Sequence, residues 1–92
     1  MQTKRDPIAP FNLGNVQAEL GNFKAARLSY QSAIARDPRF SEAHFNLAGV
    51  FESAGNLDAA ADHLRQALNI DQSYAEAHFN LAHLALKADA QV

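Results

Sequence analysis

The sequence predicts an all-α fold in which antiparallel helix hairpins stack side by side, and three observations predict it. The 92 residues repeat themselves at a fixed offset of 34. Within each repeat the apolar residues recur at helical spacing in two separate stretches. A glycine divides the two stretches, at the point where a first helix would end. We therefore expect five helices arranged as a helical repeat stack.

The repeat is visible as identical residues. Glu42–Ala48 recurs unchanged as Glu76–Ala82, and a step back of 34 from Phe45-Asn46-Leu47 reaches Phe11-Asn12-Leu13. Aligning residues 7–40 with 41–74 gives 11 identities in 34 positions. Repeats with such a period bury their apolar faces on one another. The single domain, residues 1–92, divides into repeat one at 7–40, repeat two at 41–74, and the first helix of repeat three at 75–88.

Local signals place the helices near 10–20, 23–36, 41–54, 57–70 and 74–88. Pro10 suits the first turn of its helix, where a missing N–H costs little. Gly21-Asn22 and Gly55-Asn56 suit the turns inside the hairpins, with Asn56 as a cap. Ser41 is expected to cap the third helix. Asp37-Pro38 ends the second helix.

Small residues in phase predict close helix packing. They are Ala26 and Ala33, Ala60 and Ala67 in the second helices, and Gly14, Ala48 and Ala82 in the first helices. Leu13, Leu47, Leu81, Tyr30 and Leu64 are expected to fill the spaces between them. Enlarging a small residue at such a position should overpack the hairpin.

Composition excludes several classes of protein. Hydrophobic residues make up 48% and charged residues 20%, so a disordered chain is excluded. The absence of cysteine excludes disulfides, thiolate metal sites and cysteine nucleophiles. No apolar run approaches the ~18 residues of a membrane helix, and the N-terminus does not resemble a signal peptide. We expect a cytoplasmic protein without a membrane partner.

The net charge of −2 is unevenly distributed. Residues 1–40 carry six basic and three acidic side chains, whereas residues 41–92 carry two basic and seven acidic ones. Two interpretations stay open: ordinary solvated helix faces, or a positive and a negative end that favour head-to-tail contact between copies. Neither half is basic enough to predict nucleic-acid binding by this segment.

No motif predicts catalysis. The four histidines, His44, His63, His78 and His83, lack the spacing of metal ligands, so we interpret them as packing or surface residues. The serines form no nucleophile elbow, and no glycine-rich phosphate loop is present. We expect no enzyme activity, no cofactor and no metal.

The chain resembles the tetratricopeptide repeat family. Unit one matches that pattern with Leu13-Gly14, Gly21, Ala26, Tyr30, Ala33 and Pro38. Unit two matches it with Leu47-Ala48, Phe51, Gly55, Ala60, Leu64 and Ala67. The departures are Pro10, His44 and His78 at the leading aromatic, Gln17 and Ala85 at the second, and Gln72 at the proline. The resemblance implies a right-handed superhelix whose inner groove binds an extended peptide or a partner helix.

The resemblance also implies which residues face the groove. They are Ile8, Phe11, Asn12, Asn15 and Glu19, then Glu42, Phe45, Asn46, Gly49 and Ser53, and then Glu76, Phe79, Asn80, His83 and Lys87. As the peptide-binding set we select Phe11, Asn12, Asn15, Phe45, Asn46, Gly49, Phe79, Asn80 and His83. The row of Asn12, Asn46 and Asn80 resembles the asparagine ladder of the O-GlcNAc transferase repeat domain, since an amide can donate to and accept from a peptide backbone. The alternative is that these asparagines tie neighbouring helices together.

One specialisation of the family is not expected here. Repeats that hold the C-terminal carboxylate of heat-shock chaperones use two asparagines and three basic side chains. Asn15 and Asn46 fit that pattern, but Phe11, Glu76 and Asn80 stand where the cations should be. Glu76 would repel a carboxylate, so a chaperone-tail clamp is not predicted.

The third unit suggests a second possible function, which is self-association. The sequence contains its first helix but not the second, and Leu81, Leu84 and Ala85 would pack on that missing helix. Exposed leucines favour association, so the chain is expected either to be an excerpt of a longer array or to form a homo-oligomer. Repeats of similar sequence also follow the DNA-binding domain of some bacterial MerR-type regulators, so the chain could be the self-association module of a larger regulatory protein.

Overall fold

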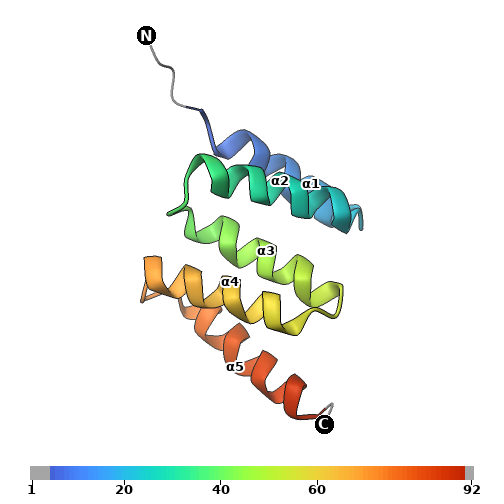
Figure 1. Cartoon of the computed structure of the whole chain (residues 1–92), viewed down its shortest axis with the longest axis vertical. Helices are drawn as coiled ribbons and strands as arrows, with labels where there is room; N and C mark the ends of the chain where they lie inside the picture. The colour runs from blue at the N-terminus through green and yellow to red at the C-terminus, as the bar shows by residue number, and fades with distance from the viewer. Residues whose placement is uncertain (1–4, 91–92) are drawn as a thin grey trace.

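The computed structural model describes residues 5–90, and these form five helices and no strand. The helices are α1 (Ile8–Glu19), α2 (Phe23–Arg36), α3 (Ser41–Ser53), α4 (Leu57–Ile70) and α5 (Ala75–Ala90). They are stacked in chain order, with the two termini at opposite ends (Figure 1). Helices α1 and α2 form one hairpin, α3 and α4 a second, and α5 packs on α4. The predicted all-α repeat stack is confirmed. None of the described helices has the length and apolar character needed to cross a membrane.

The hairpin turns follow the predicted chemistry. Gly21 and Gly55 have φ angles of +79° and +81°, the left-handed conformation that glycine adopts without strain. Asn56 caps α4, since its Oδ1 accepts a hydrogen bond from the backbone N of Ala59 at 3.2 Å. The predicted cap at Ser41 is wrong. The cap position is Phe40, because the carbonyl oxygen of Asp37 accepts from the N–H of Phe40 and closes the turn one residue earlier.

The bounds of α2 and α4 are those predicted, and the ends of α1, α3 and α5 lie within two residues of the predicted ones. Helix α1 begins at Ile8, before the predicted residue 10, because the Asp6 carboxylate accepts a hydrogen bond from the Ile8 N–H at 2.8 Å. Pro10 lies in the first turn, as expected. Helix α5 continues to Ala90, two residues beyond the predicted end.

Small residues set the spacing between helices, as predicted. Ala26, Ala33, Ala60 and Ala67 are fully buried. The same prediction is wrong for Ala82, which is exposed on α5 because no further helix packs on it in the described residues. The closest approach is at Gly14, where a Cβ atom would lie 2.7 Å from a ring carbon of Tyr30. The Tyr30 ring therefore rests directly on the backbone of α1, and no larger residue fits at position 14 without movement.

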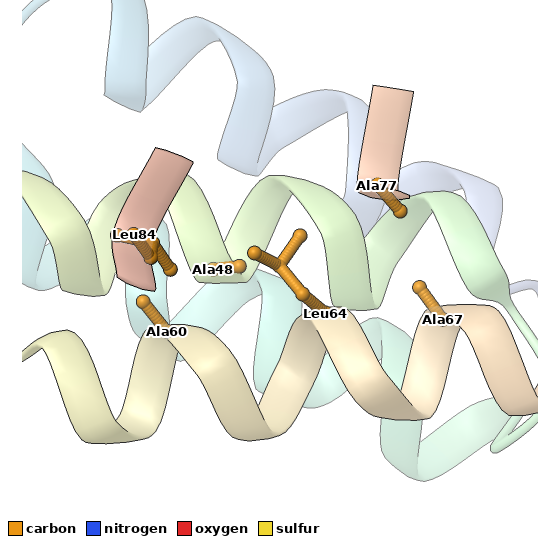
Figure 2. Packing of buried hydrophobic residues seen from close by; sticks show 6 residues of the cluster. All are labelled: Ala48, Ala60, Leu64, Ala67, Ala77 and Leu84. Atoms are coloured by element: carbon orange, nitrogen blue, oxygen red, sulfur yellow. The ribbon is translucent and has the colours of Figure 1, made fainter. Parts of the chain in front are cut away.

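The core continues into α5. Leu84 and Ala77 of α5 pack with Ala48, Ala60, Leu64 and Ala67 in one cluster (Figure 2). Leu84 is only 3% exposed, so the expectation that it lacks a packing partner is wrong. Its side chain extends toward Ala60 on α4, which has no side chain large enough to fill that space. Leu81 is half-buried and Ala85 is exposed.

The outer edge of α1 is more exposed than expected. Leu13 is 52% exposed, although its equivalent one repeat later, Leu47, is fully buried. Val16 is similarly 53% exposed, against 5% for Val50. Leu47 and Val50 pack against Ala26 and Tyr30 of the preceding hairpin, whereas no helix precedes α1 in the described residues. The expectation that Leu13 fills a space between helices is therefore wrong here.

Candidate functional site

Two adjoining pockets follow the first helices of the repeats. The Phe79 pocket, about 400 Å³, is lined by Phe45, Ala75, Glu76, Phe79 and Asn80. The Gly49 pocket, about 270 Å³, is lined by Ala18, Phe23, Tyr30, Phe45, Asn46, Gly49, Val50, Ser53 and Asn80. Phe45 and Asn80 line both pockets, so the two form one continuous surface that runs from α1 to α5. We call this surface the inner groove.

The inner groove contains five of the nine residues in the predicted peptide-binding set. They are Phe45, Asn46, Gly49, Phe79 and Asn80. The other four, Phe11, Asn12, Asn15 and His83, line neither pocket. The candidate site is therefore concentrated on α3 and α5, and α1 contributes only Ala18.

The asparagines of the predicted row have different environments. The Asn15 Oδ1 accepts two hydrogen bonds, from the Tyr30 hydroxyl at 2.6 Å and from the Asn46 Nδ2 at 2.8 Å. Burial raises the pKa of Tyr30, so its hydroxyl stays protonated and can donate at neutral pH. Asn46 therefore ties repeat two to repeat one, as the alternative interpretation expected. Its Oδ1 and its second N–H are not used in this bond.

Asn80 is less constrained than Asn46. It is half-buried, lines both pockets, and its side chain makes no hydrogen bond to any residue in 5–90. Asn12 is exposed and outside the groove. The inner groove thus has two neighbouring amides, one oriented by a fixed bond and one with its full donor and acceptor capacity.

The aromatic residues of the first helices are partly covered by a second aromatic row. The Phe11 ring lies 4.6 Å from that of Phe40, and the Phe45 ring is stacked 5.0 Å from that of Tyr74, measured between centroids. Phe79, in contrast, is 71% exposed. Residues 40 and 74 were not predicted as part of the site, although both are aromatic and lie 34 positions apart.

The Phe79 end of the groove is electronegative. Burial, together with Glu42, Glu76 and Asp71, raises the pKa of Tyr74 to about 12. Lys87 is the one basic residue among the predicted inner-face positions, and its Nζ is paired with the Glu52 carboxylate at 2.9 Å. The carboxylates near Tyr74 are therefore not balanced by this lysine.

His44 and His63 pack between α3 and α4, whereas His78 and His83 are exposed. His44 is buried, its Nε2 donates to the carbonyl of Pro38 at 3.2 Å, and its Nδ1 lies 3.1 Å from the Nδ1 of His63. His78 repeats the first of these bonds, with its Nε2 2.9 Å from the carbonyl of Gln72. Burial, and then the neighbouring His44, lower the pKa of His63. Within residues 5–90, no three potential metal ligands come together.

The family of the chain follows from this repeat geometry and from its sequence. Residues 11–75 match the tetratricopeptide repeat family. The chain belongs to this family, a class of helical repeat proteins whose stacked units present extended concave surfaces for protein binding.

Solved structures of the same fold support the assignment. A crystal structure of MamA superimposes with a TM-score of 0.91 at 21% identity, over 95% of this chain and 51% of that one. A second MamA structure gives 0.84 at 23% identity, over 86% and 43%. The first tetratricopeptide domain of Spaghetti, bound to the HSP90 peptide SRMEEVD, gives 0.88 at 18% identity, over 91% and 67%. The chain spans about half the length of the MamA proteins. No curated protein sequence matches it.

Proposed function

We propose that the chain is a protein-interaction scaffold without catalytic activity, and that its inner groove binds an extended peptide of another protein. The observation that supports this most strongly is the continuity of the groove. Two pockets share Phe45 and Asn80, and both amides, Asn46 and Asn80, line it. A continuous surface with an apolar floor and a few polar groups is typical of a ligand-binding site.

The groove has the chemistry to hold a peptide backbone. A primary amide can donate to a backbone carbonyl and accept from a backbone N–H. The bond to Asn15 orients Asn46 in advance, which lowers the entropy lost on binding. Gly49 leaves the floor open, since no atom lies within 4 Å of the place where its Cβ would be. We expect micromolar affinity, about −8 kcal/mol; the amide contacts contribute only about 0.5–1.5 kcal/mol each, so apolar contact with the aromatic residues must contribute much of the rest.

The ligand that we propose for this chain differs in charge from the peptide bound by the Spaghetti domain. That peptide, SRMEEVD, has three acidic residues near its end. In this chain Glu76 lines the corresponding first-helix surface, and an acidic peptide would be repelled there. We therefore propose a ligand without an acidic end.

Selection from a random library of ten-residue peptides tests the proposal. For the selected peptides, Asn80→Ala and Phe79→Ala should each weaken binding by about two- to tenfold, because each removes a contact of about 0.5–1.5 kcal/mol. Gln66→Ala, at an exposed position of α4, is the control and should leave affinity unchanged. Binding that is insensitive to the groove variants, or equally sensitive to the control, would contradict a groove site.

Self-association remains a second candidate function, supported by the exposed outer edge of α1. Leu13 and Val16 are more than half exposed there. At the other end, Leu81 and Ala85 line a pocket of about 230 Å³ between α4 and α5. Burying one leucine fully contributes about 1.5–3 kcal/mol, so joining these edges would stabilise an oligomer. Leu84 also lines this pocket, but at 3% exposure it would add little area to the proposed contact.

Light scattering over a range of concentrations tests this second candidate. Self-association predicts a mass that rises with concentration and returns to the monomer value in the variant Leu13→Glu. A monomer mass that persists up to about 1 mM, where contacts of only −4 kcal/mol would still be detected, would exclude self-association by this chain.

A further inference from the structure

The Phe79 pocket presents aromatic faces to a ligand. Phe45 forms one wall, and its ring is held by stacking on Tyr74 with an angle of 26° between the rings. Phe79 also lines the pocket and is 71% exposed. Its ring is nearly parallel to that of His83, at 7° and 6.3 Å between centroids. The pocket, which we call the slot, is therefore lined by two aromatic side chains, of which Phe45 is held by stacking on Tyr74.

One carboxylate lines this slot, and two more lie near Tyr74. Glu76 lines it directly, and Glu42, its equivalent one repeat earlier, is close enough to act on the Tyr74 hydroxyl together with Asp71. The ion pairs formed within residues 5–90 are Arg65–Asp62 and Lys87–Glu52. None of the three carboxylates around Tyr74 takes part in them. The negative potential at the slot is thus not neutralised by a neighbouring cation of the described chain.

Aromatic faces and carboxylates without an ion-pair partner attract the same kind of ligand group. The face of an aromatic ring is negative, so a cation placed over it is stabilised. A guanidinium group adds a planar stacking surface and a fork of N–H donors that fits a carboxylate, and the Asn80 Oδ1 could accept a further N–H. A carboxylate in the same slot would meet Glu76 and would be repelled.

We propose that the Phe79 pocket receives the side chain of an arginine or lysine from a peptide bound in the inner groove, so that the groove selects basic peptides. The inference rests on the proposed peptide-binding function and deepens it by naming the ligand chemistry. Asn46 and Asn80 hold the backbone without sequence preference. Glu42, Glu76 and Phe79 supply the preference for a cation.

Peptides selected from the random ten-residue library against the full chain provide the first test. The proposal predicts that the selected peptides are enriched in arginine and lysine, and that binding weakens as salt is added, because screening reduces exposed charge interactions. Groove-binding peptides with no basic enrichment would overturn this inference and leave the proposed function standing. Failure to obtain any peptide sensitive to Asn80→Ala would overturn both.

The best basic peptide and its counterpart with citrulline in place of arginine provide the second test. Citrulline keeps the shape of arginine but is uncharged. Glu76→Gln and Glu42→Gln should each weaken the arginine peptide about two- to fivefold and leave the citrulline peptide nearly unchanged. Asp62→Asn, which removes the same charge from the exposed side of α4, is the matched control and should affect neither peptide. Equal losses for both peptides would contradict a charge-based preference.

A second copy of the chain could in principle provide the cation, because residues 1–40 are basic. In that case the mass of the free protein would rise with concentration, and Glu76→Gln would reverse the rise. That result would contradict the proposal, since the occupant of the pocket would then be a folded copy and not a peptide.

Discussion

Replacing Gly14 with alanine tests how α1 and α2 pack. A Cβ atom at this position would lie 2.7 and 2.8 Å from two carbons of the Tyr30 ring, distances that real side chains do not tolerate. Tyr30 is buried on its other sides by the core, and its hydroxyl donates to Asn15 at 2.6 Å. The ring can therefore move away from the new methyl group only by giving up packing or this hydrogen bond.

The expected size of the effect is a balance of two opposing terms. Overpacking a core of this kind costs about 1–3 kcal/mol. Exchanging a glycine for alanine inside a helix stabilises it by about 0.8–1 kcal/mol. We therefore expect Gly14→Ala to lower the free energy of unfolding by about 0–2 kcal/mol. In a chain of this length, each kcal/mol lowers Tm by about 4–8 °C.

Gly49→Ala provides a matched control. It makes the same substitution in the interior of α3, but no atom lies within 4 Å of the added Cβ. Only the higher helix propensity of alanine then contributes, so this variant should be more stable than the wild type by up to about 1 kcal/mol. Urea unfolding followed by circular dichroism measures both variants. If Gly14→Ala proved as stable as Gly49→Ala, the close packing of Tyr30 on α1 would be refuted.

Three further predictions concern polar and small residues. Asn46→Ala should lower the free energy of unfolding in urea by about 0.5–1.5 kcal/mol, because it removes the hydrogen bond to Asn15. Asn80→Ala should leave the free energy of unfolding unchanged, and equal losses in the two variants would contradict the different environments of these asparagines. Because burial lowers the pKa of His63 in the folded state, the unfolded chain binds more protons below about pH 6.5, so stability should fall as pH decreases from there and be constant above about pH 7.5. Thermal melts across this range should show the trend, and His63→Asn, which can still donate to His44, should lose most of it. Ala60→Leu should lower the free energy of unfolding by about 1–3 kcal/mol, since Ala60 is fully buried beneath Leu84; an unchanged melt would contradict the packing described.

The parts of the fold that depend on local chemistry were predictable from the sequence. Gly21 and Gly55 have the positive φ angles expected of residues after a helix, and the in-phase alanines are buried except Ala82 of α5. Such features depend on a few neighbouring residues, and the repeat confirms each of them twice. The period of 34 then predicts the order in which the hairpins stack.

The features that depend on the environment of each repeat were harder to predict. Leu13 and Leu47 are equivalent in sequence. Leu13 is 52% exposed and Leu47 is fully buried, because in the described residues only Leu47 has a preceding hairpin to pack against. Leu84 is buried because Ala60 leaves space for it, a relation between residues far apart in the chain. Sequence periodicity treats all units alike, so it cannot show which unit lies at an edge.

The candidate site was only partly predictable for a related reason. Of the in-phase asparagines, Asn46 and Asn80 line the inner groove and Asn12 does not, and the row did not indicate that Asn15 would hold Asn46. That bond joins two repeats and depends on the rotamers of both side chains. The stacking of Tyr74 on Phe45 could have been anticipated, because aromatic residues also recur at positions 40 and 74.

The most direct test of the central claim is an NMR titration of the full chain with the best peptide selected from the library. If the inner groove binds the peptide, the side-chain amide of Asn80 and the backbone amides of Gly49 and Phe79 should shift together, with one affinity. Residues on the exposed side of α4, such as Asp62 and Arg65, should not shift. Shifts confined to the outer edge of α1, around Leu13 and Val16, would place the binding surface elsewhere and contradict the account.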